Sequence, residues 1–154
     1  MSARLRRQIE VEREQINRLL EVHRPLLAKC AGAAPDAIER SALAAMLHSF
    51  YTGIENLLKR IAVECDAGPP QGDAWHRALL DAMTRPGSRR PAAISQDTRD
   101  ALRPYLDFRH VFRHAYSFDL RWEKMAALVT GCEPTWRTVE GELAAFLDRL
   151  DRGT

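Results

Sequence analysis

The stretch Phe108-Arg109-His110-Val111-Phe112-Arg113-His114-Ala115-Tyr116 places a charge inside an apolar helix face. Each residue of a helix advances by about 100°, so the side that carries Arg109 also carries Leu102, Tyr105, Leu106, Phe108, Phe112 and Tyr116. The other side collects Arg103, Asp107, His110 and His114. An unpaired guanidinium among apolar side chains is energetically expensive. We therefore predict that another side chain of the protein meets Arg109, and that His110 and His114 lie at the polar border.

Apolar residues spaced by three and four predict further helices on both sides of this stretch. Long helices are expected at about 2–30, 36–66, 96–115 and from about 134 onward, and shorter ones at 73–84 and 120–130. Short polar side chains satisfy the first N–H groups of a helix, which makes N-caps of Asp36, Asp73, Ser95 or Asp97, and Asp119. Gly131 is expected to end the second short helix.

These helices define the predicted fold class. No segment shows the strong alternation of a β-strand, so the sequence predicts an all-α protein. Four long amphipathic helices joined by short turns specify an antiparallel four-helix bundle, here with two additional short helices. The 154 residues suit a single domain over 1–154, with 1–30 as a long N-terminal helix and 151–154 as a frayed tail. The arginine-rich loop 84–91 is expected to be mobile and solvated rather than a guide for phosphate.

Composition sets limits on the function. A hydrophobic content of 45% and a charged content of 29% are those of an ordinary soluble globular protein. The net charge of +2 gives no overall electrostatic case for nucleic acid. Cys30, Cys65 and Cys132 are far apart and are interpreted as small core residues rather than a disulfide framework or a zinc site. No apolar run approaches a membrane span and no apolar signal core follows the first residues, so we expect a cytoplasmic protein.

The spacing within the opening stretch resembles a known signature. Arg109 is followed by the polar His110, then after four intervening residues by His114, and after one more by Tyr116. This pattern resembles the ribonuclease signature of the HEPN superfamily. Its extended form, ending in the tyrosine, resembles HepT, the toxin half of HEPN/MNT toxin–antitoxin pairs. Two flanking stretches, 50–62 and 73–80, resemble the second helix of HepT-like proteins and the helix that follows it, so the resemblance spans roughly residues 36–150.

The chemistry of these side chains is consistent with RNA cleavage. RNA can be cut without a metal when its 2′-hydroxyl attacks the adjacent phosphate, which requires proton transfer near neutral pH and a fixed positive charge at the phosphate. Histidine suits the first task and arginine the second. The reaction moves two protons, and one chain offers only one histidine and one arginine for it. A symmetric homodimer would bring two copies of each residue to one cleft.

The resemblance assigns roles to individual residues. It implies a metal-independent endoribonuclease with a composite site at a helix-bundle dimer interface and 2′,3′-cyclic phosphate products. His114 is then the proton-transfer group and Arg109 the phosphate stabiliser, His110 orients or assists the site, and Arg113 binds a flanking phosphate. Tyr116 matches the tyrosine that a cognate MNT-type nucleotidyltransferase antitoxin modifies with AMP. No cofactor is expected, and no metal either, because His110 and His114 have no H-E-x-x-H pattern or nearby cysteine.

Two alternatives stay open from the sequence. Glu55 lies beside the inward stripe of its helix; we favour an acid exposed to solvent over an ion partner of Arg109. The whole chain is alternatively a non-catalytic HEPN-like binding module that holds a nucleotidyltransferase or a nucleotide. In that module an intramolecular partner would lock Arg109, and the dimer cleft would be closed to a nucleotide.

Overall fold

The computed structural model describes residues 2–114, 116 and 120–153. Their regular structure consists of α1 (Ser2–Cys30), α2 (Ala37–Cys65), α3 (Trp75–Ala82), α4 (Gln96–Arg113) and α5 (Trp122–Arg152). The predicted N-cap Asp119 lies outside the described residues. The fold is all-α, as predicted. None of the helices in the described part of the chain combines the length and apolarity needed to cross a membrane.

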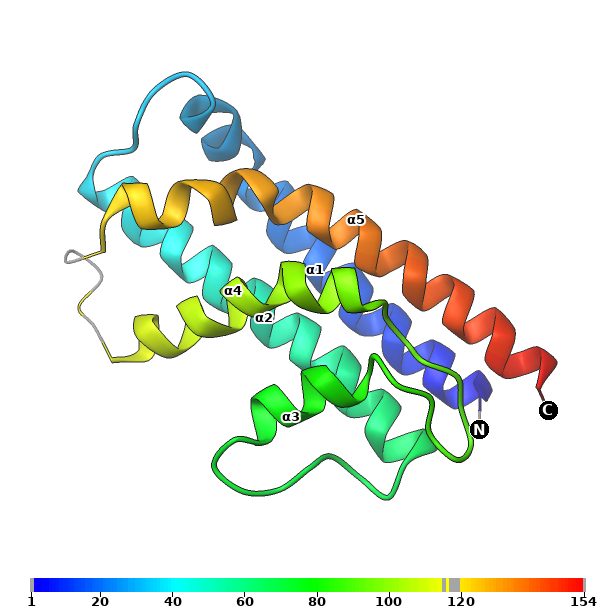
Figure 1. Cartoon of the computed structure of the whole chain (residues 1–154). Coiled ribbons are helices and arrows are strands. Elements are labelled where there is room, and N and C mark those ends of the chain that lie inside the picture. The colour runs from blue at the N-terminus through cyan, green and yellow to red at the C-terminus, as the bar shows by residue number, and fades with distance from the viewer. Residues whose placement is uncertain (1, 115, 117–119, 154) are drawn as a thin grey trace.

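The four long helices form a bundle. Helix α1 packs against α2 and α5, and α4 packs against the same two helices, which closes the ring of four. The short helix α3 lies against α2 and α4, beside the C-terminal half of α2 (Figure 1). Both termini lie at one end of the bundle (Figure 1). The fold thus places α3 next to the C-terminal half of α2.

Two of the three predicted N-caps that lie among the described residues are confirmed. The Asp36 side chain accepts from the Glu39 N–H at 2.8 Å, and the Glu39 side chain accepts from the Asp36 N–H at 3.0 Å. This reciprocal pair is a capping box. Ser95 caps α4 by accepting from the Thr98 N–H. The expected cap at Asp73 is wrong, because Ala74 is the N-cap of α3 and no side chain caps it.

Helix α5 corrects the prediction of a separate short helix at 120–130. Gly131 and Pro134 lie inside one continuous helix (Figure 1), which changes direction within its first half. The Tyr105 hydroxyl donates to the Leu128 carbonyl at 2.7 Å, and a Cβ on Gly131 would lie 3.2 Å from that hydroxyl. Gly131 therefore serves the close approach of α4 to α5, and it does not end the helix.

The core is formed by all five helices. Its largest fully buried side chains include Phe50, Tyr51, Trp136 and Phe146. Cys65 and Cys132 are buried and Cys30 is partly buried, all as free thiols. At the end of α5, Asp151 and Arg152, expected in a frayed tail, are helical, and Asp151 pairs with Arg6 of α1 at 2.6 Å.

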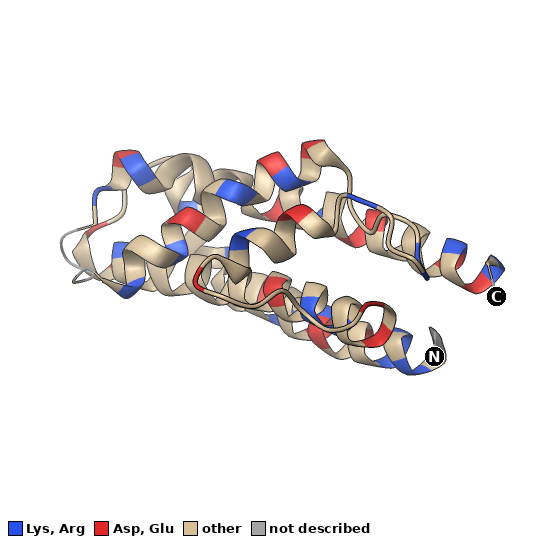
Figure 2. Cartoon of the chain, turned by 60° about the horizontal axis from the view of Figure 1, so that its bottom comes forward, with Lys and Arg blue, Asp and Glu red and all other residues tan. Residues whose placement is uncertain are grey.

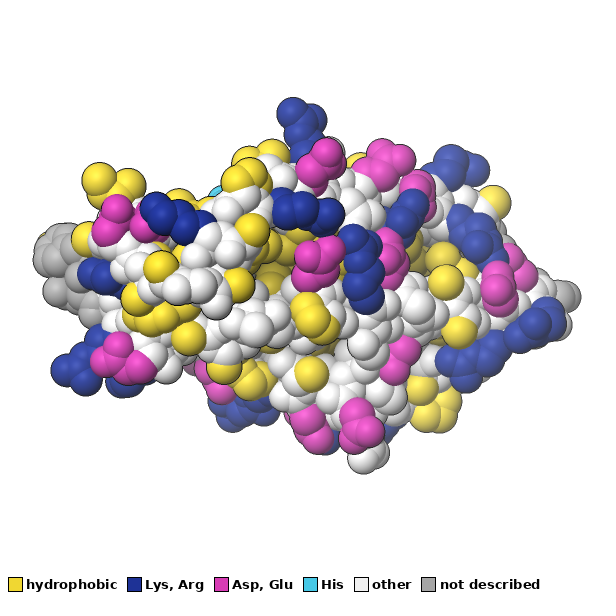
Figure 3. All heavy atoms as spheres, turned by 90° about the horizontal axis from the view of Figure 1, so that it is seen from above, with side chains coloured by type: hydrophobic (Ala, Val, Ile, Leu, Met, Phe, Trp, Pro, Cys, Tyr) yellow, Lys and Arg dark blue, Asp and Glu magenta, His cyan; other side chains and the backbone are white. Residues whose placement is uncertain are grey.

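Acidic and basic residues are mixed along the described helices. Figure 2 shows acidic and basic residues interspersed along the helices. In the view of Figure 3, acidic and basic side chains lie next to each other, with small groups of apolar side chains between them. This mixture agrees with the net charge of +2, so an anion site would depend on a local arrangement of residues.

Candidate functional site

A buried ion pair joins α2 to α4. Nη1 of Arg109 donates to Oε1 of Glu55 at 2.8 Å, and the two side chains are 13% and 3% exposed. The prediction that another side chain meets Arg109 is thus confirmed. The favoured interpretation of Glu55 as an exposed acid is wrong, because α2 packs against four other helices and its buried surface extends around Glu55.

A third residue shares the same carboxylate. Nδ1 of His76, in α3, lies 2.6 Å from Oε2 of Glu55, so the two oxygens of Glu55 contact one residue each. The His76 ring stacks on Trp75 at 3.7 Å between ring centroids, and the ammonium of Lys59 lies 4.6 Å from the Trp75 ring. Stacking and hydrogen bonding together fix the orientation of the imidazole.

Sequence reasoning missed His76, although a signal was present. The residue precedes the buried Leu79 and Leu80 by three and four positions. Residues at these spacings share one side of a helix, so His76 had to lie on the side of α3 that faces the bundle. What the sequence could not provide is the position of α3 against α2, which brings His76 to Glu55.

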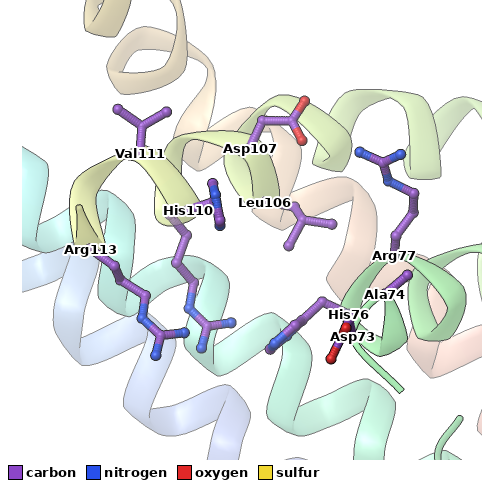
Figure 4. Close-up of a pocket in the computed structure, with 10 residues that line it drawn as sticks. Asp73, Ala74, His76, Arg77, Leu106, Asp107, His110, Val111 and Arg113 are labelled. Carbon is purple, nitrogen blue, oxygen red and sulfur yellow. The ribbon is translucent and has the colours of Figure 1, made fainter. Parts of the chain in front are cut away.

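A pocket of about 520 Å³ opens beside this network. It lies between α3 and α4 (Figure 4), and its lining residues are Asp73, Ala74, His76, Arg77, Leu106, Asp107, Arg109, His110, Val111 and Arg113. Three arginines, two histidines and two aspartates therefore surround one small space. Such a wall has the donors and positive charges that bind a phosphate.

The two motif histidines lie on the outer side of α4, as predicted. His110 and His114 are exposed, and their ring centroids are 4.8 Å apart. His110 lines the pocket, whereas His114, the C-cap of α4, is not among the described residues that line it. Arg113 is exposed and belongs to the pocket, and Tyr116 is 73% exposed just beyond the helix. The structure thus gathers Arg109, His110, Arg113 and Glu55, and places His114 and Tyr116 outside the pocket.

Burial and charge change the acid–base properties of two neighbouring residues. Burial, and then the positive charges of Arg109 and Arg113, lower the pKa of His48. Burial, and then the negative charge of Glu55, raise the pKa of Tyr51 far above its usual range. Oη of Tyr51 and Nε of Arg109 are buried without a hydrogen-bond partner among the described residues. Such unsatisfied buried atoms are exceptions in folded proteins, and here two of them lie in the residues around the ion pair.

The predicted basic loop is only partly solvated. Arg85 and Arg89 are exposed, but the Arg90 side chain is 3% exposed and donates to both carboxylate oxygens of Asp66, at 2.8 and 3.0 Å. Arg90 also donates to the carbonyl of Arg85 at 2.9 Å. The expectation of a mobile, solvated segment is therefore wrong for Arg90. Its ion pair with Asp66 links the loop to the C-terminal end of α2.

Within residues 2–114, 116 and 120–153, no cluster of three or more His, Cys, Asp or Glu side chains is arranged to bind a metal ion. Beside the pocket, one carboxylate instead contacts an arginine and a histidine through its two oxygens. This arrangement suits the binding of an anion and the transfer of a proton.

Comparison with known proteins gives a family match. A family model described as HepT-like protein matches residues 42–150, which include most of α2, all of α3 and α4, and nearly all of α5. The comparisons with curated proteins and with solved structures gave no match. The matched range includes Glu55, Arg109, His114 and Tyr116. Since this range is well over half of the chain, the protein belongs to the HepT-like protein family.

Proposed function

We propose that this HepT-like chain is a metal-independent endoribonuclease, the toxin of a HEPN/MNT toxin–antitoxin pair, which acts as a homodimer on RNA in the cytoplasm. The observation that carries the proposal is the position of Arg109. Its guanidinium is held by Glu55 at the wall of a pocket that also presents His110 and Arg113. A fixed cation in a partly enclosed site stabilises the charge of a phosphorane more strongly than one in open water.

The reaction uses side chains of the protein and the RNA itself. The 2′-oxygen attacks the adjacent phosphorus, the bond from phosphorus to the 5′-oxygen breaks, and a 2′,3′-cyclic phosphate remains. One proton leaves the 2′-hydroxyl and one is delivered to the 5′-oxygen. His114 transfers one of these two protons, Arg109 stabilises the phosphorane, His110 orients the substrate, and Arg113 holds a flanking phosphate.

The position of His114 supports a shared site. It lies at the exposed end of α4, outside the pocket that contains Arg109. The same end of the helix exposes Val111, whose side chain is 51% accessible. An apolar residue between exposed cationic and titratable groups suits contact with a second copy of the chain. In such a dimer, His114 of one subunit approaches the pocket of the other.

Tyr116 provides a means of control in the proposed system. Its side chain is 73% exposed and follows His114 by two residues. Transfer of AMP to this hydroxyl by the partner nucleotidyltransferase would place a bulky anion next to the motif. The phosphate of that group would compete with RNA for the cations and block access sterically.

One observation favours the alternative function, a non-catalytic module that binds a nucleotidyltransferase or a nucleotide. Arg109 is locked by an intramolecular partner, as expected for such a module. The pocket beside it is open, however, and a locked arginine is also a preorganised one. The two functions therefore differ in whether chemistry takes place in the pocket.

RNA cleavage in EDTA distinguishes them. We expect the purified protein to cut RNA in the presence of the chelator, and His114→Ala to reduce the rate by about 10²-fold or more with an unchanged melting temperature. His23→Asn is the matched control, because His23 lies on α1 and its Nδ1 contacts the Leu19 carbonyl. Undiminished cleavage by His114→Ala would remove that residue from its role. Failure of the wild-type protein to cut RNA, with retained nucleotide binding, would establish the binding module.

A further inference from the structure

The imidazole of His76 has no role in the proposed reaction, although it lies in the pocket. Its Nδ1 contacts Oε2 of Glu55 at 2.6 Å, and the residue lines the same space as Arg109 and His110. The side chain is 28% exposed, so it is partly accessible from the pocket. The buried carboxylate of Glu55 thus holds the imidazole in place, while a ligand in the pocket can still reach the side chain.

The hydrogen bonds of Glu55 determine where the protons of His76 are. Oε1 of Glu55 accepts a hydrogen bond from Arg109, and a carboxylate in such an ion pair can only accept hydrogen bonds. Nδ1 of His76 must therefore carry the proton in the contact with Oε2. A neutral imidazole has one donor nitrogen and one acceptor nitrogen. The lone pair is consequently on Nε2, on the edge of the ring that does not face Glu55.

The surroundings fix the orientation of this ring, which lines the pocket. The ring stacks on Trp75, and Lys59 lies over the Trp75 ring. Figure 4 shows His76 extending from α3 across the pocket towards the side from which His110 and Arg113 project. An acceptor nitrogen with a fixed orientation, close to an arginine that can bind a phosphate, has the geometry required of a general base.

We propose that Nε2 of His76 accepts the proton of the attacking 2′-hydroxyl. The inference rests on the proposed ribonuclease function and supplies its second proton-transfer group. The 2′-oxygen bonds to phosphorus as its proton moves to Nε2, and the 5′-oxygen leaves with a proton from His114. The negative charge of Glu55 stabilises the imidazolium that forms, as in other carboxylate–histidine pairs. In the proposed dimer, the base and the acid then come from different helices of different subunits.

The pH dependence of this step belongs to a group of charges. The ionisable residues around His76 are Glu55 and Lys59 from α2, Asp73 and Arg77 from the α3 region, and Asp107, Arg109, His110 and Arg113 from α4. The pH–rate profile of the wild-type protein therefore reflects all of these groups together. If replacement of His76 changes the acid limb of this profile, His76 is the member of the set that accepts the proton.

The first experiment separates proton transfer from a structural role of His76. His76→Asn places an amide N–H near the position of Nδ1 and keeps a donor to Glu55, but it has no acceptor in place of Nε2. Single-turnover cleavage in EDTA is measured across pH for the wild-type protein, His76→Asn, His76→Ala and the control His23→Asn. We expect both His76 variants to lose about 10²-fold or more, with no acid limb, and the control to retain the wild-type profile.

A second substrate separates the base from the acid. When sulfur replaces the bridging 5′-oxygen, the leaving thiolate needs no proton, so loss of a general acid is tolerated and loss of a general base is not. We expect the defect of His76→Asn to persist on this substrate and that of His114→Ala to shrink. A His76→Asn defect that disappears on the sulfur substrate would overturn the inference, and so would rescue of cleavage by asparagine relative to alanine.

The tautomer in the wild-type protein gives a test that does not depend on any His76 variant being folded. Nitrogen NMR of the neutral imidazole should show a protonated Nδ1 and an unprotonated Nε2. A protonated Nε2 would overturn the inference while leaving the ribonuclease proposal intact. A wild-type protein that cuts no RNA would overturn both.

Discussion

The carboxylate of Glu55 accepts a hydrogen bond from Arg109 across 54 positions of sequence, at 2.8 Å. The two side chains are 3% and 13% exposed, so neither charge has much access to water. Buried charges are tolerated when they are paired and hydrogen-bonded. The contact therefore ties α2 to α4 and fixes the guanidinium at the pocket wall.

Removal of one partner of this pair should destabilise the protein strongly. Glu55→Ala leaves the Arg109 guanidinium largely buried and without its carboxylate, for which we expect a loss of about 3–5 kcal/mol in the free energy of unfolding. Urea denaturation followed by circular dichroism measures it. The matched double variant, Glu55→Met with Arg109→Met, should lose clearly less than the sum of its two single variants. Additive losses would show that the ion pair contributes no coupling energy.

Glycine at position 53 should be required for the close contact of α1 and α2. A Cβ there would lie 2.7 Å from Cγ1 and 2.9 Å from Cδ1 of Ile16, which is itself buried. We expect Gly53→Ala to destabilise the fold by about 1–2 kcal/mol, since overpacking exceeds the gain in helix propensity.

Gly141 provides the control for this substitution. It lies inside α5, and no described atom outside its local helix backbone comes within 4 Å of a Cβ added there. Gly141→Ala should therefore stabilise the protein by about 0.5–1 kcal/mol. Thermal unfolding measures both effects. Equal increases in stability from the two alanine substitutions would show that Ile16 does not limit the space at Gly53.

The sequence was sufficient for the bundle and for one half of the site. Helical periodicity predicted the long helices, and the position of Arg109 within an apolar arc required a buried partner. Local chemistry also identified the caps at Asp36 and Ser95. These features depend on residues within a few turns of each other, and sequence patterns report such relationships directly.

The other half of the site depends on contacts between distant segments. Most glutamates are exposed, and only the packing of α2 against α4 makes Glu55 a buried partner. The docking of α3 likewise brings His76 to the same carboxylate. The prediction that Gly131 ends a helix is wrong because its close approach to Tyr105 is a tertiary contact, while a local rule treats glycine as the end of a helix.

Arg90 should contribute much more to stability than its neighbour Arg89. The Arg90 side chain is 3% exposed and binds both oxygens of Asp66, whereas Arg89 is exposed. We expect Arg90→Ala to lower the free energy of unfolding by about 3 kcal/mol and to increase proteolysis of residues 84–91. Arg89→Ala should stay within about 0.5 kcal/mol of the wild-type protein. Similar effects of the two substitutions would contradict the anchoring role of Arg90.

His48 should make the protein less stable in mild acid. Burial and the charges of Arg109 and Arg113 lower its pKa in the folded state below the ordinary value of 6.5. The unfolded chain then binds the proton more readily than the folded protein. The free energy of unfolding is therefore unaffected by His48 above pH 6.5, and it declines as pH falls from 6.5 towards the lowered pKa. His48→Gln removes this titration. The difference in unfolding free energy between about pH 7.5 and about pH 5.5 should therefore be smaller in the variant.

The acidic residues provide an internal control for this pH effect. Hydrogen bonds with Arg13 and Lys29 lower the pKa values of Glu10 and Glu39, respectively, below 4.5, so their contributions are lost only at lower pH. A loss that begins below about pH 6.5 and is absent from His48→Gln therefore belongs to the histidine. An unchanged slope in that variant would assign the effect to other groups. Because His48 packs against Phe112 at 5.2 Å between ring centroids, its protonation would disturb the same end of α4 that carries the motif.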